Sequence, residues 1–203
     1  MQYRALAIEG AWEITPRQYP DERGVFLEWF KEETFAGEVG RRLALAQANI
    51  SVSAVGVVRG IHYADVPPGQ AKYVTCPKGS VYDVVVDIRA GSPTFGEWDA
   101  VVLDDQDRRA VFVSEGLGHV FMSLEDGSTV AYLCSTPYNP SGEHGIDPFD
   151  PAIGIDWPGE ARDGSPLKPF LSDKDAGAPS LAEAEESGIL PTLEATRDLR
   201  RSM

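Results

Sequence analysis

The candidate general bases of this chain are its three histidines, His62, His119 and His144. His62 lies in residues 56–63, whose apolar, Val-rich composition is typical of a β-strand, and Lys72 follows ten residues later. An imidazole titrates near neutral pH. A nearby ammonium can stabilise an enolate oxygen as negative charge builds on it. These two residue types suit the abstraction of a proton next to a carbonyl.

The local sequence around His62 leaves two interpretations open. An isolated histidine in a strand is more often a hydrogen-bonded core residue than a catalyst. Gly60 favours the second interpretation, because glycine inside a strand often marks a bulge or a close approach by a ligand. Strict alternation would put Arg59 and His62 on opposite faces. Both can contact one ligand only if the strand bulges near Gly60, or if one of them acts from the mouth of a cavity.

Other side chains could complete such a site. Lys72 could also be a solvated lysine at a sheet edge. Tyr132 could be a general acid or a core tyrosine with a satisfied hydroxyl, and Tyr138 could be a loop aromatic or a stacking platform. The carboxylates that could orient the His62 imidazole are Asp83, Asp87 and Asp175.

The sequence gives little support for a metal site or for nucleophilic catalysis. His62 is followed by Tyr63 and Ala64, so the His-x-His pair of metal-binding cupins is missing. His119 with Glu143 or His144 would make a scattered ligand set, so we predict no metal. We find no serine or cysteine nucleophile motif, no phosphate-binding loop and no dinucleotide fingerprint.

The elements that must position these residues are mostly short strands. Turn-forming residues separate β-rich runs over 71–76, 81–88, 98–103, 110–113 and 128–134, a spacing that predicts an all-β sandwich or barrel. Residues 84–86 are three consecutive valines, which predicts a strand covered on both faces. One short helix is expected to begin within 31–35. Another is expected after Ser180, which has capping-box spacing to Glu183, and residues 158–179 read as an extended tail.

Residues 47–53 alternate polar and apolar side chains. The pattern alone favours a strand whose polar residues, Gln47, Asn49, Ser51 and Ser53, face water. The alternative is a strand whose polar face lines a wet cavity.

Composition limits the class of protein. The 203 residues predict one domain, with a core over about 1–160 and a tail with a helix over 161–203. The formal net charge of −14 argues against a nucleic-acid partner, which needs a basic face. Cys76 and Cys134 lie in apolar surroundings and are expected to be reduced. With no signal peptide and no apolar run of about 20 residues, the chain is predicted to be cytoplasmic and free of membrane spans.

Seven segments resemble one family, the dTDP-4-dehydrorhamnose 3,5-epimerases, and they follow the family's order: 21–26, 47–53, 56–62, 87–98, 116–121, 132–138 and 171–175. The resemblance implies a cupin-like jelly-roll β-barrel that forms a homodimer and needs neither a metal nor an organic cofactor. It implies a dTDP-4-keto-6-deoxy sugar as substrate, epimerised at C3 and C5.

The resemblance also implies roles for individual residues. His62 matches the base, Asp175 its orienting partner, Tyr132 the general acid and Lys72 the cation that faces the C4 oxygen. The residues that match substrate contacts, some of them across the dimer interface, are Arg23, Phe26, Glu28, Gln47, Asn49, Ser51, Arg59, His119, Tyr138, Glu143 and Lys174. In this interpretation Gln47, Asn49 and Ser51 face a cavity.

The chain departs from the family pattern at two places. Ala64 stands where many members have glutamine, and the region before Leu171 is longer than in compact members. Some relatives epimerise only C3 or only C5 with much the same residues. A non-catalytic nucleotide-sugar-binding cupin and a metal-dependent cupin oxygenase are alternatives from other classes.

Overall fold

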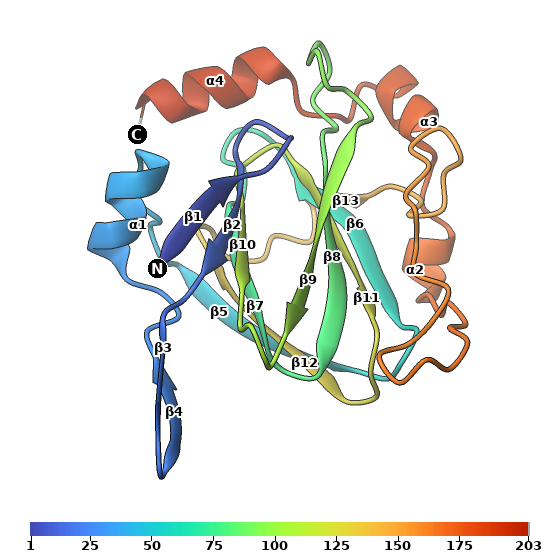
Figure 1. Cartoon of the computed structure of the whole chain (residues 1–203). Helices are drawn as coiled ribbons and strands as arrows, with labels where there is room; N and C mark the ends of the chain where they lie inside the picture. Colours follow the sequence, from blue (N-terminus) through green and yellow to red (C-terminus); the bar gives the residue numbers. More distant parts are fainter. Residues whose placement is uncertain (203) are drawn as a thin grey trace.

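Two antiparallel sheets face each other in the computed structural model, which describes residues 1–202 (Figure 1). The six-stranded sheet has the order β1 (Gln2–Ala5), β2 (Ala11–Thr15), β10 (Ala110–Val113), β7 (Lys72–Lys78), β12 (Ser128–Cys134) and β5 (Gln47–Ser53). The five-stranded sheet has the order β13 (Glu143–Gly145), β6 (Val58–Ala64), β11 (Gly118–Ser123), β8 (Ser80–Val86) and β9 (Trp98–Asp104). A hairpin of β3 (Gln18–Asp21) and β4 (Gly24–Leu27) projects from this body. The predicted all-β, cupin-like class is confirmed.

The five strands predicted from the sequence all exist, with bounds that differ by no more than two residues. Their apolar side chains form three cores. One lies between the sheets and includes Val85, while a second includes Val84 and Val86 and packs against the C-terminal part of the chain. The strand with three consecutive valines is therefore covered on both faces, as predicted. The third core lies between the six-stranded sheet and α1, where Phe35 is fully buried.

Two of the four helices within residues 1–202 were predicted. Helix α1 (Glu32–Val39) begins after Lys31 and ends at Gly40, whose left-handed conformation (φ 80°) terminates it. Helix α3 (Leu181–Glu186) has the predicted capping box between Ser180 and Glu183. Helix α2 (Asp173–Ala176) interrupts the predicted extended tail, and the prediction missed α4 (Leu193–Ser202).

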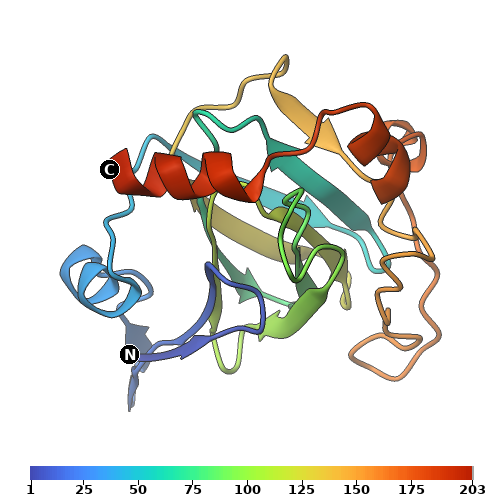
Figure 2. The same ribbon diagram turned by 90° about the horizontal axis from the view of Figure 1, so that it is seen from above.

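The C-terminal segment covers one end and one side of the two sheets. Figure 2 shows α4 lying across that end, with α3 beside it. Arg200 of α4 donates a hydrogen bond to Ser114 over 2.7 Å. Gly116 is required at this contact, because a Cβ there would lie 2.2 Å from the Thr196 methyl group. The tail residues are therefore held against the body.

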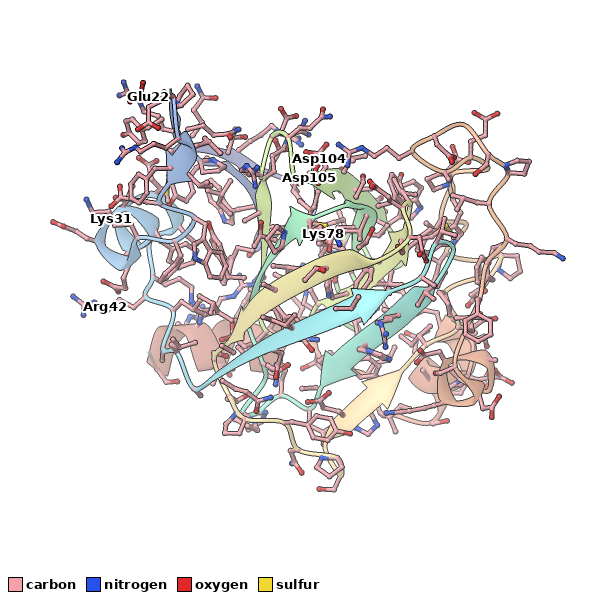
Figure 3. The ribbon with its side chains drawn as sticks, turned by 90° about the horizontal axis from the view of Figure 1, so that it is seen from below. Glu22, Lys31, Arg42, Lys78, Asp104 and Asp105 are labelled. Carbon is pink, nitrogen blue, oxygen red and sulfur yellow. The ribbon has the colours of Figure 1, made fainter. Side chains whose placement is uncertain are left out.

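Charged residues of both signs are spread over the surface. In Figure 3, Lys31 and Arg42 lie on the side of α1, Glu22 lies at the tip of the hairpin, and Lys78 lies near Asp104 and Asp105. Both cysteines are buried and free, which confirms the prediction of reduced thiols. Within residues 1–202, no helix is both long enough and apolar enough to span a membrane.

Candidate active site

A cavity of about 590 Å³ opens between the two sheets and is closed on one side by tail residues 170–175. Its walls come from β5, β12 and β7 of one sheet and from β6, β11 and β13 of the other. The predicted site residues that line it are His62, Tyr132, Lys72, Asp175, Gln47, Asn49, Ser51, Arg59, His119, Tyr138, Glu143 and Lys174. Most of the residues that sequence reasoning selected therefore meet in one place.

His62 and Asp175 form a hydrogen-bonded pair with 2.7 Å between Nε2 and Oδ1. The Asp175 side chain is almost fully buried, and the His62 side chain is one-third exposed toward the cavity. Burial opposes ionisation of Asp175, but hydrogen bonds from His62 and Ser172 and the charge of Lys174 outweigh it and lower the pKa of Asp175. The carboxylate therefore stays ionised. When this carboxylate accepts a hydrogen bond from the Nε2–H group, the Nδ1 atom of His62 is left as the basic nitrogen.

The strand that carries His62 bulges at the predicted place. Arg59 pairs with Phe121 and His62 pairs with His119, so two residues of β6 oppose one residue of β11 between these pairs. Gly60 lies in this bulge with φ +118°, and a Cβ there would come within 2.4 Å of the His119 carbonyl oxygen. The bulge turns Arg59 and His62 toward the same cavity.

The other two candidate carboxylates have different partners. Asp83 accepts a hydrogen bond from His119 at 2.9 Å, which makes a second buried His–Asp pair. Asp87 binds Arg89, Ser92 and Thr94. Burial opposes ionisation of Asp87, but these hydrogen bonds lower its pKa to about 2. The pattern-based suggestion that Asp83 or Asp87 orients His62 is therefore wrong.

Tyr132 enters the cavity from the opposite sheet, where its ring packs against the core between the sheets. Burial, and then the nearby Cys134 and Glu143, raise the pKa of its phenol, while Arg59 acts in the other direction. A phenol with a raised pKa remains protonated at neutral pH and can donate its proton.

Lys72 lines the cavity at the start of β7, so the interpretation as a solvated edge lysine is wrong. Burial lowers the pKa of its ammonium, and the nearby Cys134, Glu143 and Asp83 partly restore it. A cation that is poorly solvated interacts strongly with negative charge that develops beside it.

Strand β5 is oriented opposite to the pattern-based preference. Its polar residues Gln47, Asn49 and Ser51 line the cavity, whereas Ile50 and Val52 are 73% and 62% exposed. Ser53 is buried and accepts a hydrogen bond from Arg59 over 3.1 Å. The pattern is misleading because β5 is an edge strand whose inner face borders the cavity and whose apolar face lies uncovered in the single chain.

Three predicted contacts are not brought to the cavity of their own chain. Arg23, Phe26 and Glu28 lie on or next to the β3–β4 hairpin, which extends away from the body (Figure 1). Arg23 is exposed and pairs with Asp21, and Phe26 is 67% exposed.

The described residues contain no group of three or more potential metal ligands close enough to hold an ion. His144, one of the candidate ligands, instead shares a hydrogen bond of 2.8 Å with Asp65. Sequence reasoning missed several cavity residues, namely Val57, Val58, Gln70, Phe121, Val130, Phe170 and Ser172. Most of them look like ordinary core or loop residues in the sequence. Ser172 had a detectable signal, because it precedes three polar residues in the pattern of a helix N-cap.

Fold and site together define a class, a cupin-like all-β protein with an acid–base cavity between its sheets. The model of the family described as dTDP-4-dehydrorhamnose 3,5-epimerase matches residues 5–183. A protein of that name from Mycolicibacterium smegmatis is 58% identical over 95% of this chain and 92% of its own length. A Streptomyces niveus protein named dTDP-4-dehydrorhamnose 3-epimerase is 57% identical over 95% of this chain and 89% of its own.

A solved structure, the rmlC epimerase of Mycobacterium tuberculosis, superimposes with a TM-score of 0.95 at 54% identity and covers 100% of both chains. The chain belongs to the dTDP-4-dehydrorhamnose 3,5-epimerase family.

Proposed function

We propose that the chain epimerises dTDP-4-dehydro-6-deoxy-D-glucose at C3 and C5, giving dTDP-4-dehydro-L-rhamnose, without a metal or an organic cofactor. The observation that carries this proposal is the placement of a His62–Asp175 pair and the Tyr132 phenol on different sheets of one cavity. Inversion of a carbon needs a base on one side of the sugar and an acid on the other. The names of the family and of its relatives support the substrate.

The mechanism follows from the properties of each group. The C4 ketone acidifies the protons on C3 and C5, and Nδ1 of His62 removes one of them. Negative charge moves to O4, where the Lys72 ammonium stabilises the enolate. Tyr132 then returns a proton to the opposite face and inverts the centre. A rotation of the sugar in the cavity lets the same groups deprotonate and reprotonate the second carbon.

Binding of the nucleotide diphosphate is assigned to the basic residues of the cavity. Arg59 and Lys174 line it, and a guanidinium suits a diphosphate because it donates parallel hydrogen bonds. Gln47, Asn49, Ser51, His119 and Glu143 supply polar contacts, and Tyr138 supplies an exposed ring for stacking on thymine. These local cations let a protein with a net charge of −14 bind an anionic ligand.

The active unit is proposed to be a homodimer. Ile50 and Val52 expose an apolar face on the edge strand β5, and Phe26 exposes another on the hairpin. Burying such surfaces against a second copy is favourable. In that dimer, Arg23, Phe26 and Glu28 of one protomer would reach the cavity of its partner. This would explain why they lie outside their own cavity.

The whole chain is proposed to act as one domain. The His62–Asp175 pair joins the body to the tail, so the core over 1–160 and the tail after it share one site. The predicted boundary at Met203 lies outside the described residues. The free thiols are consistent with a cytoplasmic enzyme.

A C3-only epimerase is the second candidate, because a 57% identical relative is named a 3-epimerase. Proton NMR of the product formed in D₂O separates the two. Inversion and deuterium at both carbons support the main proposal, and inversion at C3 alone supports the second. Absence of turnover and exchange would favour a non-catalytic binding module. Stoichiometric iron together with oxygen uptake would favour an oxygenase.

The variant His62→Ala tests the base. Loss of a general base typically costs about 10²–10⁴-fold in rate, so deuterium incorporation at C3 and C5 should disappear while dTDP binding persists. His144→Ala is a matched control, since His144 lies in the same cavity but is bound to Asp65. Near-wild-type exchange in His62→Ala would remove His62 from the mechanism.

A further inference from the structure

The cavity wall changes its chemical character along β12. Val130, Tyr132 and Cys134 are spaced two residues apart, so they follow one another on the same face of the strand, about 6.6 Å per step. Cys134 pairs with Lys72 of β7 and with Gln47 of β5. The inner face of β12 therefore runs from an aliphatic side chain, past the proposed acid, to the position of the proposed cation.

The end of the cavity near Val130 is apolar. Val130 and Phe121 are buried, line the cavity and belong to the same core against which the Tyr132 ring packs. Phe121 pairs with Arg59 across β11 and β6, and Val130 pairs with Ser51 across β12 and β5. Arg59 joins the two sheets here through its hydrogen bond to Ser53. An apolar floor thus lies beside the cation assigned to the diphosphate.

The opposite end is polar. Lys72, Gln47 and Glu143 line this end. Glu143 is the first residue of β13 and pairs with Ala64 at the end of β6. A sugar bound with O4 toward Lys72 has C1 and its diphosphate directed toward Arg59, because C1 and C4 lie across the ring from each other. The substituent on C5 then lies between Tyr132 and the Arg59 end.

We propose that Val130 and Phe121 form the binding surface for the C6 methyl group and make the site selective for 6-deoxy sugars. This inference rests on the proposed function. The methyl is the one alkyl substituent of the hexose ring, and contact with buried apolar side chains is favourable. A C6 hydroxyl in the same place would lose its hydrogen bonds to water, because neither Val130 nor Phe121 offers a partner.

Two stable ligands that differ only at C6 test the inference, dTDP-6-deoxy-D-glucose and dTDP-D-glucose. Neither carries the ketone, so calorimetry measures binding without turnover. An apolar pocket rejects an added hydroxyl by up to roughly a hundred-fold, so the wild-type protein should bind the 6-deoxy ligand roughly ten- to a hundred-fold more tightly.

Val130→Thr keeps the shape of the side chain and adds a hydroxyl that can pair with the C6 hydroxyl. We expect this variant to reduce the preference at least about five-fold. Val111→Thr is the matched control, because Val111 is equally buried in the same core but does not line the cavity. It should keep the wild-type ratio. If Val130→Thr does not fold, Val130→Ala should reduce the preference by removing contacts with the methyl.

Three results would overturn the inference. Equal affinity of the wild type for both ligands would refute the proposed binding surface for the methyl group and leave the proposed function intact. An unchanged ratio in a folded Val130 variant would place the methyl elsewhere. Failure of the wild type to bind either ligand would refute the proposed function itself, and the inference with it.

Discussion

His62 and Tyr132 are suited to complementary roles, as proton acceptor and proton donor, because their surroundings differ. His62 is partly exposed to the cavity and bound to an ionised carboxylate, whereas burial raises the pKa of the Tyr132 phenol. The first group is suited to accept a proton and the second to hold one. The two residues come from facing sheets, so the division between base and acid follows from the architecture.

Replacement of the phenol should separate proton removal from inversion. Tyr132→Phe keeps the ring and its packing but removes the donor, so deuterium exchange at C3 or C5 should persist while inverted product falls roughly 10²-fold or more. Proton NMR in D₂O measures both quantities in one sample. Tyr82→Phe is a matched control, because Tyr82 packs against Trp157 outside the cavity. A normal yield of inverted product from Tyr132→Phe would assign the acid to another group.

The sequence pattern identified His62 but not its partner. The histidine was found because the chain has few of them and because Gly60 indicated a bulge. Asp175 lies 113 positions further on, and nothing in local periodicity separates it from Asp83 or Asp87. The resemblance to a family selected Asp175, and the fold brings it to His62. Contacts between distant segments depend on topology, which short-range patterns do not contain.

At the scale of elements, strands were easier to predict than their orientation. Alternation located β5, but alternation gives only the relative positions of side chains and cannot say which face is inside. The inner face of β5 borders a polar cavity, so the usual relation between apolar and buried is reversed there. Helix α3 was predictable because its cap is encoded within four residues, Ser180 to Glu183.

Helix α2 is the element that presents Asp175, and its N-cap should matter for catalysis. The Ser172 hydroxyl accepts a hydrogen bond from the Asp175 amide over 3.1 Å. Ser172→Ala should loosen this turn and misplace the carboxylate, which lowers kcat roughly ten-fold with KM changed less than about two-fold. Ser172→Thr should restore kcat, because threonine can also cap the helix.

A second N-cap serves as the control for that experiment. Ser180→Ala removes the cap of α3 in the same tail, away from the cavity, and should leave kcat unchanged. Steady-state kinetics of the three variants make the comparison. An equal loss in Ser180→Ala would mean that Ser172 only stabilises the tail, and a rise in KM alone would mean that it contacts substrate.

At the scale of the whole molecule, a single chain does not explain the exposed apolar surfaces of the hairpin and of the outer face of β5. Both expose apolar side chains, and Arg23, Phe26 and Glu28, which the sequence resemblance predicts to contact substrate, lie on or next to the hairpin. Sequence reasoning could select Arg23, Phe26 and Glu28 only by resemblance, because the function proposed for them depends on a second copy. If the β3–β4 hairpins cross between the two protomers of the dimer, each site combines a cavity from one protomer with a hairpin from the other.

This arrangement predicts that two defective variants restore each other. His62→Ala disables the cavity and Arg23→Ala disables the hairpin, so each homodimer should have little activity. Unfolding and refolding a mixture gives mixed dimers in which one of two sites has both parts intact. Random pairing then yields about a quarter of the wild-type activity. Activity that stays at the level of the separate variants, in mixtures shown by mass spectrometry to contain mixed dimers, would mean that each hairpin serves its own chain.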